Sequence, residues 1–139
     1  MESLAGALLL GVVSGLRTFT GVAALWLLRH TGPVAYGLGV VALLEYLGDL
    51  HPKAPPRTAA TGLSARLLAG VFCGWAVTAA AGTSPIAGAV LGACGALIGA
   101  YGGLALRLRA ISLVGSVPAA LLEDVVAVGG AIAIVLYTT

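Results

Sequence analysis

The sequence predicts an all-α polytopic membrane protein with about five transmembrane helices. Of its 139 residues, 60% are hydrophobic and 9% are charged, and the mean hydropathy is +1.08. A soluble fold of this composition would lack the polar surface to cover itself. Each crossing of a hydrocarbon layer about 30 Å thick needs about 20 apolar residues. We therefore expect one transmembrane domain over residues 1–139, with no soluble domain.

Five apolar stretches, separated by Gly, Pro or basic residues, are the predicted helices. They are residues 4–28, 33–50, 64–82, 86–106 and 117–137. Three prolines between residues 51 and 62 exclude a continuous helix there. Arg107 and Arg109 are assigned to the fourth linker, and Pro118 suits the first turn of the last helix.

The first predicted helix contains a segment that favours a break near Arg17. Residues 14–21 hold two glycines and three hydroxyl side chains around this arginine, which lies about 20 Å into the helix by residue count. Gly weakens a helix, and Ser or Thr side chains can satisfy the freed backbone groups. Such a break would expose backbone amides toward an anion. Thr18 and Thr20 therefore join Arg17 as candidate site residues.

The distribution of basic residues predicts an orientation in the bacterial inner membrane. Five crossings place most of the basic residues on or near the amino-terminal side, whereas Arg29 lies on the other. The first group is Lys53, Arg57, Arg66, Arg107 and Arg109. Basic loops stay cytoplasmic, so we expect a cytoplasmic N-terminus and an external C-terminus. The net charge of +2 is spread along the chain, which gives no indication of nucleic-acid binding.

Glycine spacing predicts close helix packing. Gly95, Gly99 and Gly103 form a four-residue repeat in the fourth predicted helix. Small residues at this spacing let helix backbones approach closely in a membrane. Packing within one chain is the simpler interpretation, and a homodimer is the alternative.

A weak internal repeat relates the two ends of the chain. Residues 42–45 recur as 120–123, so Glu45 corresponds to Glu123. Helices one and two would then mirror helices four and five, which is a plan common in secondary transporters. Residue counting places both glutamates about 9 Å from the cytoplasmic helix ends rather than at mirrored depths, which opposes this interpretation.

Ionisable residues inside the apolar stretches are the main candidates for a solute or ion pathway, because charges in a bilayer need partners or water. With the two threonines, the candidates are Arg17, Thr18, Thr20, Glu45, Asp49, Arg66, Glu123 and Asp124. Glu45 and Asp49 share a helix face, and Glu123 at similar depth would complete an acidic cluster for protons or cations. Alternatively, Arg66 forms a salt bridge with Asp49, and Arg17 forms one with Glu45 or Glu123. These pairs would then be purely structural.

The second linker offers a different chemistry. Lys53, Arg57 and Thr58 can form a phosphate-binding loop beside Asp49. Its Arg-Thr pair faintly resembles the loops of membrane polyprenyl-pyrophosphate phosphatases, in which case Glu45 or Asp49 is an acid–base candidate. The simpler interpretation is a cytoplasmic topology anchor. No nucleotide, haem or zinc motif is present in the sequence, so no cofactor is expected and the metal content is left open.

Three segments together resemble a known family. They are residues 14–20, the block from Glu45 to Arg66, and residues 121–124 followed by two glycines. Their order is similar to that of an uncharacterised bacterial membrane family catalogued as a domain of unknown function, number forty-one twenty-six. The resemblance covers nearly the whole chain and implies no activity. The family pattern has a lysine shortly after the aspartate, where this sequence has Leu50 and His51. Lys53 is the nearest basic residue that could take the place of that lysine.

The preferred functional hypothesis is a small transporter or channel-like protein. Glu45, Asp49, Glu123 and Asp124 would handle protons or cations, and Arg17 would hold a counter-charge or an anionic substrate. One alternative is a membrane enzyme acting on a lipid phosphate. The other is a non-catalytic scaffold in which the charges only lock the helices. The expected partners are the lipid bilayer and a small ion or solute, with a second copy of the chain as the alternative that the glycine spacing leaves open.

Overall fold

The computed structural model describes residues 1–49 and 59–138, with only the backbone of Asp49. These residues form six α-helices and contain no strand, so the all-α prediction is confirmed for them. The helices are α1 (Glu2–Leu16), α2 (Thr18–Arg29), α3 (Pro33–Asp49), α4 (Ala60–Ala80), α5 (Pro85–Val114) and α6 (Ser116–Tyr137). Of these, α4, α5 and α6 are long and apolar enough to cross a membrane, and α1, α2 and α3 are shorter apolar helices.

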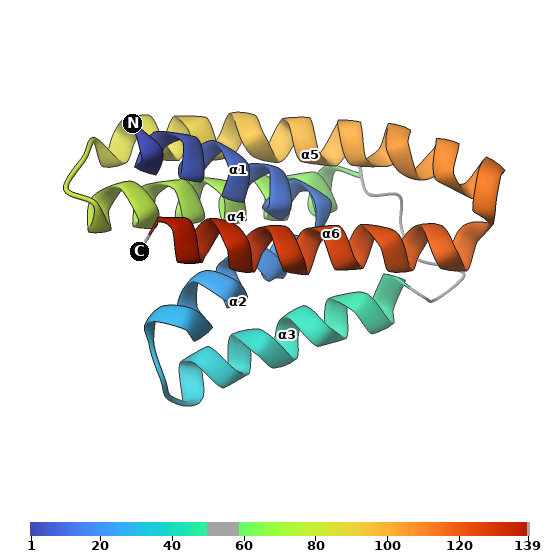
Figure 1. Ribbon diagram of the computed structural model, residues 1–139, viewed down its shortest axis with the longest axis horizontal. Coiled ribbons are helices and arrows are strands. Elements are labelled where there is room, and N and C mark those ends of the chain that lie inside the picture. Colours follow the sequence, from blue (N-terminus) through green and yellow to red (C-terminus); the bar gives the residue numbers. More distant parts are fainter. Residues whose placement is uncertain (50–58, 139) are drawn as a thin grey trace.

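The chain breaks its first helix at Arg17, as predicted, but it also turns back. Arg17 has an extended backbone (φ −140°, ψ 117°), and α2 begins at the next residue. A Cβ on Gly21 would lie 2.7 Å from Ser14 Oγ and 3.4 Å from the carbonyl oxygen of Leu10. The two helices therefore run antiparallel as a hairpin, visible in blue in Figure 1.

The structure has this hairpin where the sequence predicted one helix over residues 4–28. With 15 and 12 residues, α1 and α2 are about 22 Å and 18 Å long, too short to span a hydrocarbon layer of about 30 Å. A Cβ on Gly15 would meet the backbone of Ala96, Gly99 and Ala100, which lie midway along α5. The hairpin tip at Arg17 is therefore about halfway along the longest helix.

Both chain termini lie at the same end of the molecule (Figure 1). Ser3 Oγ is 3.1 Å from Thr83 Oγ1 in the α4–α5 turn, and Arg29 donates a hydrogen bond of 3.4 Å to the carbonyl oxygen of Thr138. We call this end, with Met1, Arg29, Thr83 and Thr138, the terminal end. The opposite end holds the α5–α6 junction, where α5 extends beyond the start of α4 (Figure 1), and we call it the basic end.

Glycines let α5 pack between α1 and α4. A Cβ on Gly92 would meet the backbone of Gly70 and Gly74 on α4, and a Cβ on Gly11 would meet the backbone of Gly92. Gly95 and Gly99 face α1 in the same way, while Gly103 faces the Leu16 side chain. Any side chain here would separate the helices, because the obstructing atoms are backbone at most of these positions.

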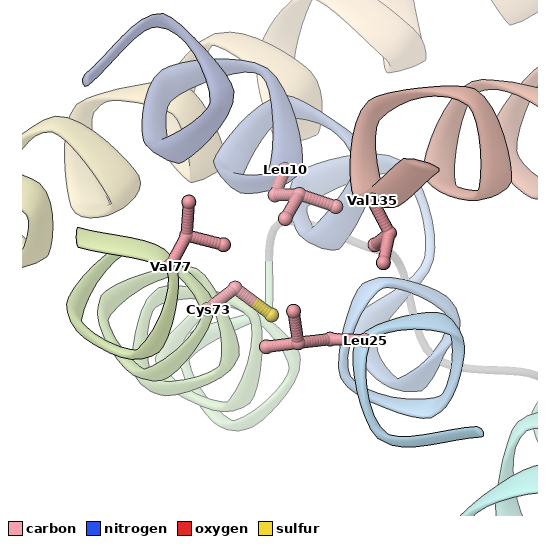
Figure 2. Packing of buried hydrophobic residues seen from close by; sticks show 5 residues of the cluster. All are labelled: Leu10, Leu25, Cys73, Val77 and Val135. Carbon is pink, nitrogen blue, oxygen red and sulfur yellow. The ribbon is translucent and has the colours of Figure 1, made fainter. Parts of the chain in front are cut away.

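The apolar core lies where the hairpin meets α4 and α6. Figure 2 shows Leu10, Leu25, Cys73, Val77 and Val135 pointing toward one another from α1, α2, α4 and α6, and all five are buried. In contrast, α3 approaches only α2 within 8 Å between Cα atoms among the described helices. It lies beside the bundle in Figure 1 and is the least embedded helix.

Two further expectations from the sequence are corrected. Arg107 and Arg109 belong to α5, not to a linker, because arginine is a good helix former and its long side chain reaches water from a helix end. The helix stops at Gly115, whose φ of +91° favours glycine. The break at residues 16–18 does not follow the internal repeat, since its counterparts, residues 94–96, lie within continuous α5.

The glycine contacts predict opposite effects for two alanine substitutions in α5. Gly92→Ala should lower the stability of the purified protein by about 1–3 kcal/mol, because the new methyl group overlaps the α4 backbone. Gly102→Ala should be neutral or stabilise the helix by up to about 1 kcal/mol, since its Cβ would meet nothing within 4 Å. Thermal unfolding in detergent measures both. Equal melting temperatures for the two variants would contradict this packing.

Candidate functional site

The tip of the α1–α2 hairpin carries a buried guanidinium. Arg17 is 1% exposed, and its Nη2 forms a salt bridge with Asp124 Oδ1 of α6. Its guanidinium carbon lies 4.7 Å from the centroid of the Tyr46 ring of α3, in a cation–π contact. The break in the helix thus brings one cation against two other helices.

Glu45 occupies the exposed amides at the start of α2. Its Oε1 accepts a hydrogen bond of 2.7 Å from the Thr18 N–H, and its Oε2 accepts one of 2.9 Å from the Phe19 N–H. The first amides of a helix have no partner within the helix, and the helix dipole favours negative charge there. The Glu45 carboxylate of α3 therefore caps α2. The sequence predicted an anion at these exposed amides.

Tyr46 adds a second link between α3 and the hairpin. Its hydroxyl lies 2.6 Å from the hydroxyl of Thr20, which is buried in α2. Sequence reasoning named Thr20 but missed Tyr46. The available signal was its place beside Glu45, as an aromatic residue with a polar tip inside an apolar stretch.

Glu123 lies in a neighbouring pair. It is 9% exposed and lies 3.5 Å from Arg107 of α5, which is 21% exposed. Asp124, one residue further along α6, is 27% exposed and pairs with Arg17. The two consecutive acids of α6 thus contact cations from different helices. The sequence analysis proposed Glu45 or Glu123 as the salt-bridge partner of Arg17; it named Asp124 as a candidate site residue but not as this partner.

The remaining predicted residues are only partly placed. Arg66 is 5% exposed in α4, so it is a buried charge as expected. The side chain of Asp49 and all of Lys53, Arg57 and Thr58 lie outside the described residues. The phosphate-loop hypothesis and the Arg66–Asp49 tie therefore stay predictions. Within residues 1–49 and 59–138, no group of three or more His, Cys, Asp and Glu side chains is placed to hold a metal ion.

The hairpin tip gathers charges from three parts of the chain. Arg17, Glu45 and Asp124 bring one positive and two negative formal charges together about halfway along α5. Coulombic interactions are strong where burial keeps water away, because the local dielectric constant is low. These contacts hold α3 and α6 to the hairpin.

Two arginine substitutions should separate the buried arginine of the hairpin tip from the more exposed arginine of α5. Arg17→Gln removes a cation that is 1% exposed and contacts both Asp124 and Tyr46, so it should destabilise the protein by about 3–5 kcal/mol. Arg107 is 21% exposed and lies 3.5 Å from Glu123, so Arg107→Gln should cost about 1–2 kcal/mol, less than Arg17→Gln. Thermal unfolding in one detergent gives the comparison. A larger loss from Arg107→Gln would contradict the assignment of Arg17 as the central charge.

Comparison with protein-family models, with curated proteins and with solved structures finds no match for the chain. The family resemblance of residues 14–20, 45–66 and 121–124 therefore stays a prediction. The function proposed below depends on the contacts of the described residues.

Proposed function

We propose that the protein is a small secondary transporter or channel-like protein of the bacterial inner membrane, linked to protons or cations through Glu45 and Asp124. The observation that carries this proposal is the short helical hairpin with a buried arginine at its tip. Helix ends at membrane depth are tolerated where protein buries them or water reaches them. Broken helices and ionisable groups at this depth are typical of solute and ion pathways.

In this proposal the hairpin is re-entrant and four helices cross the membrane. Helices α4, α5 and α6 have the required length, and α3, with 17 residues, is about 26 Å long. The α1–α2 hairpin enters from the terminal end and returns to it. Four crossings put both termini on one side, which accords with their place at one end of the fold (Figure 1).

The charge distribution orients this arrangement. Arg107 and Arg109 lie toward the basic end, and the sequence joining α3 to α4 contains Lys53 and Arg57. Arg29 lies at the terminal end. By the positive-inside rule the basic end is cytoplasmic and both termini are external. This proposal keeps the external C-terminus expected from the sequence and moves the N-terminus from the cytoplasm to the outside.

Proton coupling follows from the contacts of the two carboxylates. When Glu45 takes up a proton, it loses the charge that favours its bonds to the Thr18 and Phe19 amides. The link between α3 and α2 then weakens. When Asp124 takes up a proton, its attraction to Arg17 falls in the same way. Protonation therefore loosens the site, and deprotonation closes it again.

A scaffold function is the second candidate, and one observation favours it. Arg17, Glu45 and Glu123 each have a polar partner in this structure, as expected if the charges only lock helices together. The two candidates differ in what a conservative substitution does. In a scaffold, Glu45→Gln changes stability alone, whereas in a transporter it also abolishes proton-linked flux. The lipid-phosphate enzyme stays a prediction from the loop sequence.

Proteoliposomes with the purified protein test the transport proposal. With a pH gradient imposed, the wild type should move protons or charge. Glu45→Gln should reduce this rate by about a hundredfold, the lower range for a positioned proton-transfer group. Gln keeps one oxygen that can accept from one of the two α2 amides, so the variant should fold.

Glu123→Gln is the matched control, because Glu123 pairs with Arg107 away from the capped amides of α2. It should retain most of the flux. Protein that is folded and inserted but moves no proton, cation or charge would disprove the transport proposal. If the wild type shows no flux and Glu45→Gln only lowers the stability of the protein, the result would support the scaffold.

A further inference from the structure

Helix α3 has free space on two sides. A hollow of about 510 Å³ lies toward α4 and is lined by Leu38 of α3 and Leu68 of α4, among others. A second hollow, of about 500 Å³, lies toward α6 and is lined by Leu43 of α3 and Ile132 of α6, among others. Between these hollows the Cα atoms of α3 come within 8 Å of α2 alone among the described helices. The helix therefore has room to turn on α2, toward α4 or toward α6.

The connection from α2 to α3 can bend at a glycine. Residues 30–32 join the two helices. The His30 ring stacks on Trp26 with their centroids 4.7 Å apart, which holds His30 to α2. Gly32 has a φ of +145°, and a Cβ on it would meet nothing within 4 Å. Hinges are a few loop or helix-end residues that absorb a backbone change. Gly32 is therefore the position at which α3 can change its direction relative to α2.

Small residues form the face of α3 that contacts α2. Ala35 is 1% exposed and Ala42 is 7% exposed, and a Cβ on Gly39 would lie 3.3 Å from Leu27 Cδ1 of α2. These residues share one face of the helix because their spacing is four and three residues. Apolar contacts of this kind have no preferred direction, so a small turn of α3 changes their energy little.

The far end of α3 carries directional polar contacts. Glu45 accepts hydrogen bonds of 2.7 Å and 2.9 Å from the first two amides of α2. The Tyr46 hydroxyl lies 2.6 Å from the Thr20 hydroxyl, and the centroid of its ring lies 4.7 Å from the Arg17 guanidinium carbon. We call Glu45 and Tyr46 the α3 latch. By the helical rise it lies about 20 Å from Gly32.

We propose that α3 is the moving helix of this protein, which turns about Gly32 and is held in its present place by the α3 latch. This inference rests on the proposed transport function and names the element that moves when Glu45 gains or loses a proton. Tyr46 is a positioning residue, because its two contacts keep α3 where Glu45 reaches the α2 amides. Loss of either latch residue frees the far end of α3 and leaves the end at Gly32 in place.

Distances between pairs of spin labels, measured by pulsed electron paramagnetic resonance on the full-length chain, test this movement. Labels are attached to single cysteine pairs in a background with Cys73→Ala and Cys94→Ala. The label positions are exposed, and none of them lines either hollow. They are Leu47 and Tyr36 on α3, Ile98 on α5 and Leu136 on α6.

The wild type should give one population for each distance. In Glu45→Gln and in Tyr46→Leu, a distance from Leu47 to α5 or α6 should gain a second population. Its shift should be about 4 Å or more, since a point about 20 Å from a pivot moves this far in a turn of about 12°. The distances from Tyr36 should stay as in the wild type. Tyr46→Phe keeps the ring and loses the hydroxyl contact, so its second population should be smaller than that of Tyr46→Leu.

Two controls make the result specific. Glu123→Gln removes a carboxylate that pairs with Arg107 instead of capping α2, and its distances should match those of the wild type. The distance from Ile98 to Leu136 should be the same in every variant, because both labels lie on helices other than α3. A shift there would place the movement in the bundle and contradict its assignment to α3.

Two further results would overturn the proposal. One is an unchanged set of Leu47 distances in both Glu45→Gln and Tyr46→Leu. The other is an equal shift at Leu47 and Tyr36, which would mean that α3 moves as a whole instead of turning about Gly32.

The proteoliposome assay separates this inference from the proposed function. Glu45-dependent flux with fixed Leu47 distances would overturn the moving helix and leave transport standing. Movement of the Leu47 label without any flux would disprove transport and leave the hinge standing. The absence of both movement and flux in folded protein would overturn both proposals.

Discussion

The contact between Arg17 and Asp124 is the interaction on which the rest of this structure depends. An arginine at membrane depth costs several kcal/mol unless a partner or water compensates its charge. The break before α2 places this arginine at the tip of a hairpin, where Asp124 of α6 and the Tyr46 ring of α3 contact it. Glu45 then caps the first amides of α2. Through these contacts α3, which otherwise packs only on α2, is linked to the site.

The hairpin reaches the middle of α5 because glycines make room for it. Gly11 and Gly15 of α1 lie against the backbone of α5, and Gly92 of α5 lies against that of α4. This arrangement joins three helices at distances that side chains would not allow. It also leaves α3 outside the main bundle, in contact with α2 alone among the described helices.

The helical class, most helix boundaries and the break at Arg17 could be predicted from composition, periodicity and helix-breaking residues. The reversal at the break could not, because hydrophobic periodicity reports burial and carries no information on chain direction. In the proposed membrane arrangement, this one omission changes the number of crossings and the side of the N-terminus. The sequence also could not predict that Arg17 pairs with Asp124 rather than Glu123. Adjacent helical residues point about 100° apart, and their partners therefore depend on how the helix is rotated. Glycine spacing predicted close packing but not which helices it joins.

Cysteine labelling of the N-terminus tests the re-entrant hairpin most directly. In a background with Cys73→Ala and Cys94→Ala, Glu2→Cys and His30→Cys place one thiol at each end of the hairpin, both at exposed positions. A membrane-impermeant maleimide applied to intact spheroplasts should label both, while Arg109→Cys should react only after lysis. Labelling of His30→Cys from outside and Glu2→Cys only after lysis would mean that residues 4–28 cross the membrane once, and it would contradict the hairpin.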